Sequence, residues 1–315
     1  MARILVTGAA GFIGTALCRE LARRGHAVIG ATRGLAPPIA GVVPCPLGDI
    51  GPGTDWRGAL DRVEIVVHLA TSAHRPHAPT RVPREAGAAA ALARAAAAAR
   101  VHRLLHVSSI RAMGSATSPG APFRAGDPAR PGDRYGQAKL TIEAAVVAAA
   151  HETGLGLVIL RPPLVHGPGV KGNLRALIRL AASGLPLPLA AIDNRRSLIF
   201  LDNLVDLVAA ACTHPDAAGQ VLLARDANDL STPELIGALA AGLERPARLF
   251  AAPPAVLATL SRVPALGPLI SRLTLSLQVD DSETRRMLGW SPAIAPAAGL
   301  AATARAFARH RRSGR

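Results

Sequence analysis

The stretch Arg3-Ile-Leu-Val-Thr-Gly-Ala-Ala-Gly-Phe-Ile-Gly14 combines a short apolar run with a loop that carries three glycines. The apolar run predicts a buried strand, and residues 12–24 predict a helix that Gly25 ends. Such glycines permit a tight turn and let the backbone approach a pyrophosphate, while the helix start supplies free N–H groups. The stretch therefore predicts a dinucleotide site, formed by Thr7, Gly8, Gly11, Phe12, Ile13 and Gly14.

Short apolar runs alternate with helical segments through the first half of the chain. The predicted strands lie at 26–32, 63–70, 103–109 and 154–163, and the predicted helices at 88–100 and 134–153. Alternation at this spacing is typical of βαβ units and a parallel sheet. Strands that are apolar throughout indicate a sheet covered on both faces. The predicted fold class is α/β, a Rossmann-type doubly wound parallel sheet.

The pattern changes in the second half of the chain, where glycine and proline become frequent and most segments are helical. The stretch 196–212 predicts a strand followed by a helix. Ser231 and Thr232 are candidate caps at the start of a further helix, with Glu234 in its first turn. We expect a nucleotide-binding domain at 1–165 and a smaller, mainly helical substrate-binding lobe at 166–315. The chain is expected to cross back to the first domain around 196–225.

The composition narrows the class of protein. Half of the 315 residues are hydrophobic and 3% are aromatic, so the core is expected to be aliphatic. The three cysteines, Cys18, Cys45 and Cys212, are odd in number and far apart, which predicts a reducing compartment and no metal site. Glycines interrupt the first apolar run, so no secretory signal is expected, and no apolar run is long enough for a membrane span. We therefore expect a cytoplasmic protein.

The net charge is +15 at pH 7, and it is spread along the chain apart from the Arg-rich segment 305–315. A strongly basic chain suits nucleic acid, a membrane surface or an anionic small molecule. Aromatic residues do not alternate with basic ones, as they do in proteins that stack single-stranded bases. We therefore expect no nucleic-acid partner, and the dispersed charge favours an anionic small substrate.

The only tyrosine, Tyr135, stands four residues before Lys139, which is one of two lysines among 36 basic residues. Residues four apart are neighbours on one face of a helix. A phenol is a poor acid or base at pH 7, and a nearby cation lowers its pKa by stabilising the phenolate. The pair alone is equally compatible with a surface Tyr and a solvated Lys. Behind a dinucleotide loop, it predicts a catalytic acid–base pair.

These motifs resemble those of the extended short-chain dehydrogenase/reductase family, also called NAD-dependent epimerases and dehydratases. The glycine loop resembles the TGxxGxxG motif of the family, and the segment 135–139 resembles its YxxxK motif. The resemblance implies that Tyr135 and Lys139 also contact the cofactor. It further implies that Ser109 is the catalytic serine and contacts the substrate. The other cofactor residues that it implies are Asp49, Ile50, Leu69, Ala70, Ser108 and Pro162.

The segments 161–169 and 196–202 resemble those with which the family binds nucleotide sugars. The resemblance implies that Arg196 meets the diphosphate. Asn173, next to Lys171, is a candidate for contact with a phosphate or with uracil. A solvated loop explains these last two residues equally well.

Five positions outside the second strand depart from the family pattern. The stretch that begins at Glu85 lacks a structural Asn, and Leu164 and His166 replace the Asn and the Tyr of RxxNVYGPG. Ile110 and Arg111 stand where the sugar dehydratases of the family carry an Asp–Glu pair. This last departure argues against elimination chemistry.

The end of the second strand indicates which cofactor is used. Family members that prefer NAD usually place an acidic residue there, on the ribose hydroxyls, whereas this chain has Thr32 followed by Arg33. An Arg can pair with a 2′-phosphate, and no carboxylate repels that phosphate. Both residues are therefore expected at the cofactor, and they favour NADP over NAD. Arg33 is also one of many arginines, so NAD stays open.

The resemblance implies a hydride exchange at a carbinol or ketone carbon. Tyr135 would transfer the proton, Lys139 would lower the pKa of the phenol and hold the nicotinamide ribose, and Ser109 would hydrogen-bond the substrate oxygen. The segments SSIRAMG, HGPGVKGN and LQVDDSETRRMLGW resemble a UDP-glucose 4-epimerase-like bacterial subgroup. That subgroup includes reductases of 4-keto UDP-2-acetamido-2,6-dideoxyhexoses that serve surface-polysaccharide synthesis.

A reductase consumes NADPH, whereas an epimerase recycles a tightly held NAD. Thr32 and Arg33 therefore favour the reductase, and a NAD-dependent UDP-hexose 4-epimerase is the alternative. A non-enzymatic dinucleotide-binding sensor is an alternative of another class, against which the presence of both Tyr135 and Lys139 argues. Family members often form homodimers through the YxxxK helix. Its apolar run at 144–150 is compatible with such an interface and equally with a core.

Overall fold

The computed structural model describes residues 1–70, 81–118, 120–253, 259 and 267–313. Seven parallel strands form one sheet, in the order β3-β2-β1-β4-β5-β6-β9. The strands are β1 Arg3–Thr7, β2 Ala27–Thr32, β3 Val42–Pro46, β4 Ile65–His68, β5 Arg103–Val107, β6 Gly156–Arg161 and β9 Val221–Leu223. This doubly wound order confirms the predicted fold class.

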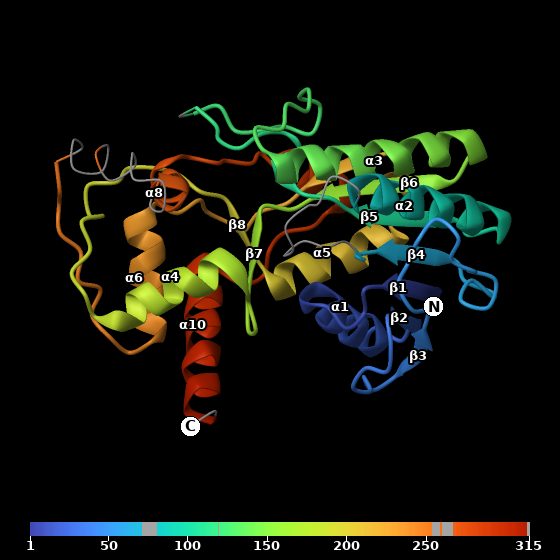
Figure 1. The fold of residues 1–315 in the computed structure, drawn as a ribbon, viewed down its shortest axis with the longest axis horizontal. Coiled ribbons are helices and arrows are strands. Elements are labelled where there is room, and N and C mark those ends of the chain that lie inside the picture. Colours follow the sequence, from blue (N-terminus) through green and yellow to red (C-terminus); the bar gives the residue numbers. More distant parts are fainter. Residues whose placement is uncertain (71–80, 119, 254–258, 260–266, 314–315) are drawn as a thin grey trace.

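Helices cover both faces of the sheet (Figure 1). On one face lie α1 Phe12–Arg23 and α5 Leu201–Thr213, and on the other lie α2 Arg81–Ala98 and α3 Arg134–Thr153. Successive strand residues point to opposite faces, so Val6 packs under α1 and α5, and Leu5 packs under α2 and α3. Each face therefore has its own aliphatic cluster, as the composition predicts.

The other helices follow β6 in the chain and are α4 Gly172–Ser183, α6 Thr232–Gly242, α8 Gly267–Thr274, α9 Ser282–Leu288 and α10 Pro296–Ser313. α4, α6 and α10 enclose a separate apolar cluster that includes Ile178, Leu239 and Leu300. Ser231 and Glu234 form a capping box at the start of α6, as predicted. α4, α6, α8 and α10 lie to one side of the sheet in Figure 1, beside a small sheet of β7 Leu164–His166 and β8 Leu198–Phe200, whereas Leu288 of α9 packs in the cluster that α1 and α5 form with the main sheet. None of the helices in the described part of the chain is long and apolar enough to cross a membrane.

The chain returns to the main sheet after β8, because α5 packs on its face and β9 pairs with β6. Both elements lie within the segment 196–225, where the crossover is predicted. The boundary between residues 165 and 166 stays a prediction.

His166, which replaces a tyrosine of the family pattern, lies in a buried polar cluster. Its Nε2 lies 3.1 Å from Oδ2 of Asp226, and its Nδ1 lies 3.3 Å from Oγ1 of Thr303. Asp226 also accepts hydrogen bonds from the backbone N–H of Phe200 and from Nδ2 of Asn203. The cluster therefore fastens α10 to β7, β8 and α5.

The sequence does not predict three of the strands, and one helix begins earlier than predicted. β3 is a half-exposed edge strand that contains Pro44 and Pro46, so it lacks a continuous apolar run. β7 and β9 have three residues each, which is too short for a visible pattern. The helix predicted at 88–100 spans Arg81–Ala98, because its polar first turn precedes the alanine run.

One buried ion pair joins α3 to the sheet. Arg161 at the end of β6 contacts Glu143 of α3, and the two side chains are 8% and 6% exposed. A charge left alone in such a place is costly, because it loses its hydration without gaining a partner.

We expect Glu143→Gln to lower the free energy of unfolding by about 3 kcal/mol, because it leaves Arg161 buried without a counter-ion. Urea denaturation measures this loss. The double variant Glu143→Leu/Arg161→Met should regain most of the loss, since no buried charge remains. Glu152→Gln is the matched control, because it breaks an exposed pair with Arg94 and should cost at most about 1 kcal/mol. Equal losses for Glu143→Gln and Glu152→Gln would contradict the prediction.

Candidate active site

The glycine loop brings the start of α1 against the end of β1. Gly8 has a φ of 70°, a conformation that favours glycine. A Cβ on Gly14 would overlap the carbonyl oxygen of Gly8, so a glycine at position 14 lets the first turn of α1 lie against the loop. Gly11 caps α1 without a side-chain hydrogen bond, which leaves the first N–H groups of the helix uncapped by any side chain. Such a helix start suits a pyrophosphate, so the loop fits a dinucleotide.

Thr7 joins this loop to the segment that follows β4. Its Oγ1 accepts hydrogen bonds from the N–H groups of Leu69 and Ala70, at 3.2 and 3.3 Å. It also lies 2.8 Å from Nδ1 of His68. Because both lone pairs are used, the hydroxyl hydrogen points to Nδ1, and the ring hydrogen of His68 sits on Nε2. Sequence patterns placed Thr7 at the cofactor but did not reveal this bridging role.

The predicted cofactor residues lie along the edge where the strands end. Thr7, Ala31, His68 and His106 are partners in the sheet register, so the residues that follow them lie at the same edge. The predicted residues just beyond the strand ends, or on them, are Thr32, Arg33, Leu69, Ala70, Ser108 and Pro162. This edge contains the switch point of the sheet, where open α/β sheets bind ligands.

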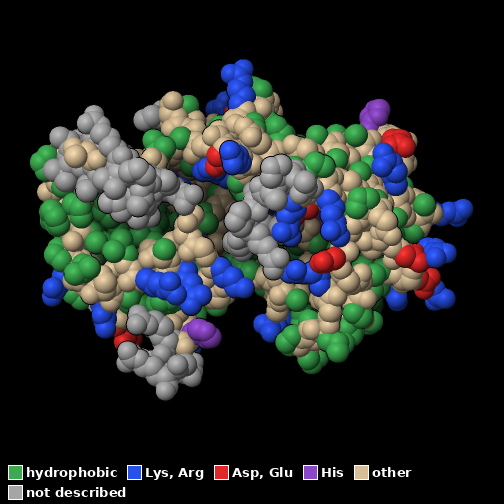
Figure 2. All heavy atoms as spheres, viewed as in Figure 1, with side chains coloured by type: hydrophobic (Ala, Val, Ile, Leu, Met, Phe, Trp, Pro, Cys, Tyr) green, Lys and Arg blue, Asp and Glu red, His purple; other side chains and the backbone are tan. Residues whose placement is uncertain are grey.

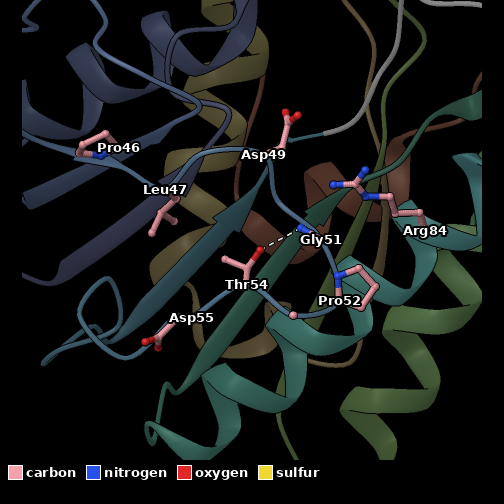
Figure 3. Close-up of a pocket in the computed structure, with 9 residues that line it drawn as sticks. Pro46, Leu47, Asp49, Gly51, Pro52, Thr54, Asp55 and Arg84 are labelled. Atoms are coloured by element: carbon pink, nitrogen blue, oxygen red, sulfur yellow. Dashed lines mark hydrogen bonds between the residues drawn. The ribbon is translucent and has the colours of Figure 1, made fainter.

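Asp49 and Ile50 follow β3, farther from the catalytic candidates. Asp49 lines an open hollow of about 480 Å³ between the segment 46–55 and α2 (Figure 3). Gly51 N–H donates to Oγ1 of Thr54 at 2.8 Å, and the Arg84 side chain points toward Gly51. The lining residues include no catalytic candidate. The contact of Asp49 and Ile50 with adenine stays a prediction.

The structure brings the three catalytic candidates together. Ser109 follows β5 and hydrogen-bonds through its side chain to Tyr135. Tyr135 lies in the first turn of α3, and Nζ of Lys139 lies 5.9 Å from the centre of its ring. Lys139 is 4% exposed, so the ammonium lies inside the protein rather than in solvent. The alternative of a surface Tyr with a solvated Lys does not describe this arrangement.

Burial sets the proton affinities of the pair. Burial raises the pKa of Tyr135, while the hydrogen bond with Ser109 and the charge of Arg111 oppose the rise and the charge of Asp133 adds to it. Burial lowers the pKa of Lys139 to about 8, against the attraction of Glu85 and Glu143. Arg111 is thus a cation that acts on the phenol and that the sequence analysis did not place at the site, and the expectation that Lys139 lowers the pKa of the phenol stays a prediction.

His68, which begins the segment predicted to line the cofactor, and His106, which the sequence analysis did not select, lie behind Lys139. His68 and His106 stack with ring centres 5.4 Å apart. Burial lowers the pKa of His68 to about 4 and that of His106 well below its ordinary value, with the charge of Lys139 adding to both effects. Both rings are therefore neutral at pH 7. Glu85, from the stretch that lacks the structural Asn of the family, supplies a negative charge near Lys139 instead.

The substrate candidates come from the second half of the chain. Lys171 occupies the position just before α4 and makes no side-chain capping hydrogen bond, and Asn173 lies in the first turn of α4; both are exposed. Arg196 is half-buried, and its Nη1 donates to the carbonyl of Leu275 at 2.9 Å. Their contact with a nucleotide sugar stays a prediction.

Comparisons with known proteins identify the family. Residues 4–223 match the NAD dependent epimerase/dehydratase family. Over 312 residues the chain is 37% identical to UDP-glucose 4-epimerase of Vibrio cholerae, covering 96% of this chain and 95% of that protein. The chain belongs to the NAD-dependent epimerase/dehydratase family.

Other members of the family are similar over the whole chain. UDP-glucose 4-epimerase of Mycolicibacterium smegmatis is 28% identical, over 97% of this chain and 98% of that protein. A crystal structure of UDP-glucuronic acid 4-epimerase from Bacillus cereus in complex with UDP-glucuronic acid and NAD shares the fold. Its TM-score is 0.78 at 20% identity, with 98% and 99% of the two chains covered. The family is one of enzymes, so the chain is an enzyme of the extended short-chain dehydrogenase/reductase type.

The buried ammonium of Lys139 predicts a pH-dependent stability. Its pKa is about 8 in the folded chain and 10.5 in the unfolded chain, so between these pH values the unfolded chain binds more protons. The contribution of Lys139 to stability therefore rises as the pH rises from 8 to 10.5.

Lys139→Met lacks this titration, so its stability relative to the wild type should fall by about 3 kcal/mol between pH 8 and pH 10.5. Urea denaturation across this pH range measures the change. Lys171→Met is the matched control, because it removes an exposed ammonium in place of a buried one. A stability difference for Lys139→Met that stays constant with pH would refute the buried ammonium.

Proposed function

We propose that this enzyme reduces the 4-keto group of a UDP-2-acetamido-2,6-dideoxyhexose during surface-polysaccharide synthesis. The observation that supports hydride chemistry is the hydrogen-bonded pair of Ser109 and Tyr135, with Lys139 buried one helical turn away. The glycine loop lies at the same edge of the sheet and suits a dinucleotide.

The side chains divide the chemistry among them. The nicotinamide dinucleotide, when bound, supplies the hydride. Ser109 donates a hydrogen bond to the substrate oxygen and stabilises the charge that develops there. Tyr135 gives that oxygen its proton. Burial raises the pKa of the phenol, and the hydrogen bond with Ser109 and the charge of Arg111 favour release of the proton by opposing that rise. Lys139 would hold the nicotinamide ribose through its ammonium.

The end of β2 supports NADP as the cofactor. Thr32 donates its hydroxyl hydrogen to the carbonyl of Gly34 at 2.6 Å, and Arg33 is exposed. No acidic residue occurs between Glu20 and Asp49, so no carboxylate from this segment repels a 2′-phosphate. Arg33 would pair with that phosphate.

A NAD-dependent UDP-hexose 4-epimerase is the second candidate function. The similarity to UDP-glucose 4-epimerases of Vibrio cholerae and Mycolicibacterium smegmatis favours it. The same three catalytic side chains serve both reactions, since an epimerase removes and returns a hydride at one carbon. In either case Arg196, Lys171 and Asn173 are the proposed contacts to the nucleotide.

We also propose a homodimer that uses α3. The apolar run 144–150 turns Val146, Ala149 and Ala150 to the core, whereas Ala144, Ala148 and Val147 are exposed, the last at 44%. The exposed half of the run supports an interface on this helix.

The lysines and arginines of the face in Figure 2 are spread over the sheet domain and the lobe alike, which suits a small anionic substrate better than an extended one.

The net reaction separates the two candidates. The purified enzyme should oxidise NADPH in the presence of a UDP-linked 4-keto sugar, and Tyr135→Phe should lower kcat by about 10²- to 10⁴-fold. Absorbance of the reduced cofactor measures both. Protein that purifies with bound NAD and interconverts UDP-hexoses without net oxidation would be an epimerase. Cofactor binding without either reaction would indicate the sensor, and full turnover by Tyr135→Phe would remove the catalytic assignment.

The cofactor proposal makes its own prediction. Arg33→Ala should raise the KM for NADPH about tenfold and leave the KM for NADH unchanged, because one charge-assisted contact is lost. Thr32→Asp should reverse the preference, since a carboxylate binds ribose hydroxyls and repels a 2′-phosphate. Steady-state kinetics with both cofactors measure this. Arg23→Ala, at an exposed Arg of α1, is the control, and an equal effect there would count against a specific role for Arg33.

A further inference from the structure

Arg111 lies between two catalytic candidates that come from different parts of the chain. Its backbone N–H donates to Oγ of Ser109 at 3.2 Å. Its carbonyl oxygen faces Gly136 so closely that a Cβ there would overlap it. Its guanidinium forms an ion pair with Asp133. One residue thus joins the segment after β5 to the first turn of α3, which carries Tyr135.

Asp133 is the other half of this connection. Its Oδ1 accepts a hydrogen bond from the N–H of Gly136 at 2.7 Å and so caps α3. Its Oδ2 faces the guanidinium of Arg111. The carboxylate therefore sets where α3 begins and at the same time neutralises Arg111.

Several charged or titratable groups surround the phenol of Tyr135. Ser109 and Arg111 face it from the segment after β5, and Asp133 and Lys139 share its helix. Behind Lys139 lie Glu85 of α2, Glu143 of α3, and the neutral His68 and His106 of the sheet.

The two cations beside the phenol, Lys139 and Arg111, differ in the pH range over which they are charged. Burial lowers the pKa of Lys139 to about 8, so its charge fades in mildly alkaline solution. A guanidinium keeps its charge at every pH at which proteins stay folded. Asp133 partly offsets that charge, since the charges of Arg111 and Asp133 shift the pKa of Tyr135 in opposite directions.

We propose that Arg111 is a positioning residue that orients Ser109 and Tyr135 and provides the permanent positive charge beside the phenol, with Asp133 as its counter-ion. The role rests on the proposed function only in that Tyr135 is the acid–base of the reaction. If the ion pair had a structural role alone, removing Arg111 or Asp133 would break the same contact. Both substitutions would then shift the pKa of Tyr135 in the same direction.

The single tyrosine of the chain allows a direct test, since the ultraviolet absorbance of phenolate reports Tyr135 alone. The midpoint of this titration should move to higher pH in Arg111→Met, which leaves Asp133 uncompensated. It should move to lower pH in Asp133→Asn, which leaves Arg111 uncompensated and keeps a residue that caps helices well. Arg111→Lys should restore most of the shift. Arg57→Met, which breaks an exposed pair with Asp55, is the control and should not move the midpoint.

Opposite shifts in the two variants support the proposal, and shifts in one direction, or none, overturn it. Circular dichroism at each pH separates a shift of Tyr135 from unfolding, and Arg111→Lys keeps the test informative if Arg111→Met does not fold. With NADPH and the 4-keto sugar, the alkaline limb of kcat/KM should follow the same order. Suppose that the titrations shift as expected while the wild type reduces no 4-keto sugar. In that case the proposed function fails, and the role of Arg111 in setting the pKa of the Tyr135 phenol stands.

Discussion

The buried ion pair between Arg161 of β6 and Glu143 of α3 determines how α3 lies on the sheet. Glu143, Lys139 and Tyr135 stand four residues apart in succession, so they share one face of the helix. When Glu143 meets Arg161, the same face turns Lys139 toward the strand ends and brings Tyr135 to Ser109. The catalytic arrangement therefore depends on a contact between two side chains that are not among the catalytic candidates.

The layer between the sheet and α3 changes from aliphatic to polar at the strand ends, where buried cations lie near carboxylates. Glu143 pairs with Arg161 and also attracts Lys139, and Glu85, which pairs with Arg81, attracts Lys139 as well. The two stacked histidines stay neutral, because burial lowers the pKa of both. The layer can thus hold an ammonium away from solvent at a moderate cost, which shows in the lowered pKa of Lys139.

The sequence predicts best the elements whose ends carry their own signals. The bounds of α3 are those predicted, because Asp133 caps its start and Gly154 adopts a left-handed conformation at its end. β3 has no such signal, since it is a half-exposed edge strand with two prolines. The contacts of the site likewise divide into those that the motifs predict and those that they do not. Motif spacing predicts that Ser109 and Tyr135 meet, whereas the Arg111–Asp133 pair joins residues 22 apart through a side-chain contact that no spacing rule encodes.

The same pair bears on which reaction the fold carries. Elimination from a sugar needs a side chain beside the catalytic serine that can take and return a proton. Ile110 is fully enclosed in an apolar cluster with Leu223 and Val279, so it offers no polar atom to a substrate. Arg111 is paired with Asp133, and a guanidinium holds its proton throughout the physiological range. Neither position can act as a base, so the residues that follow Ser109 argue against elimination and favour hydride transfer.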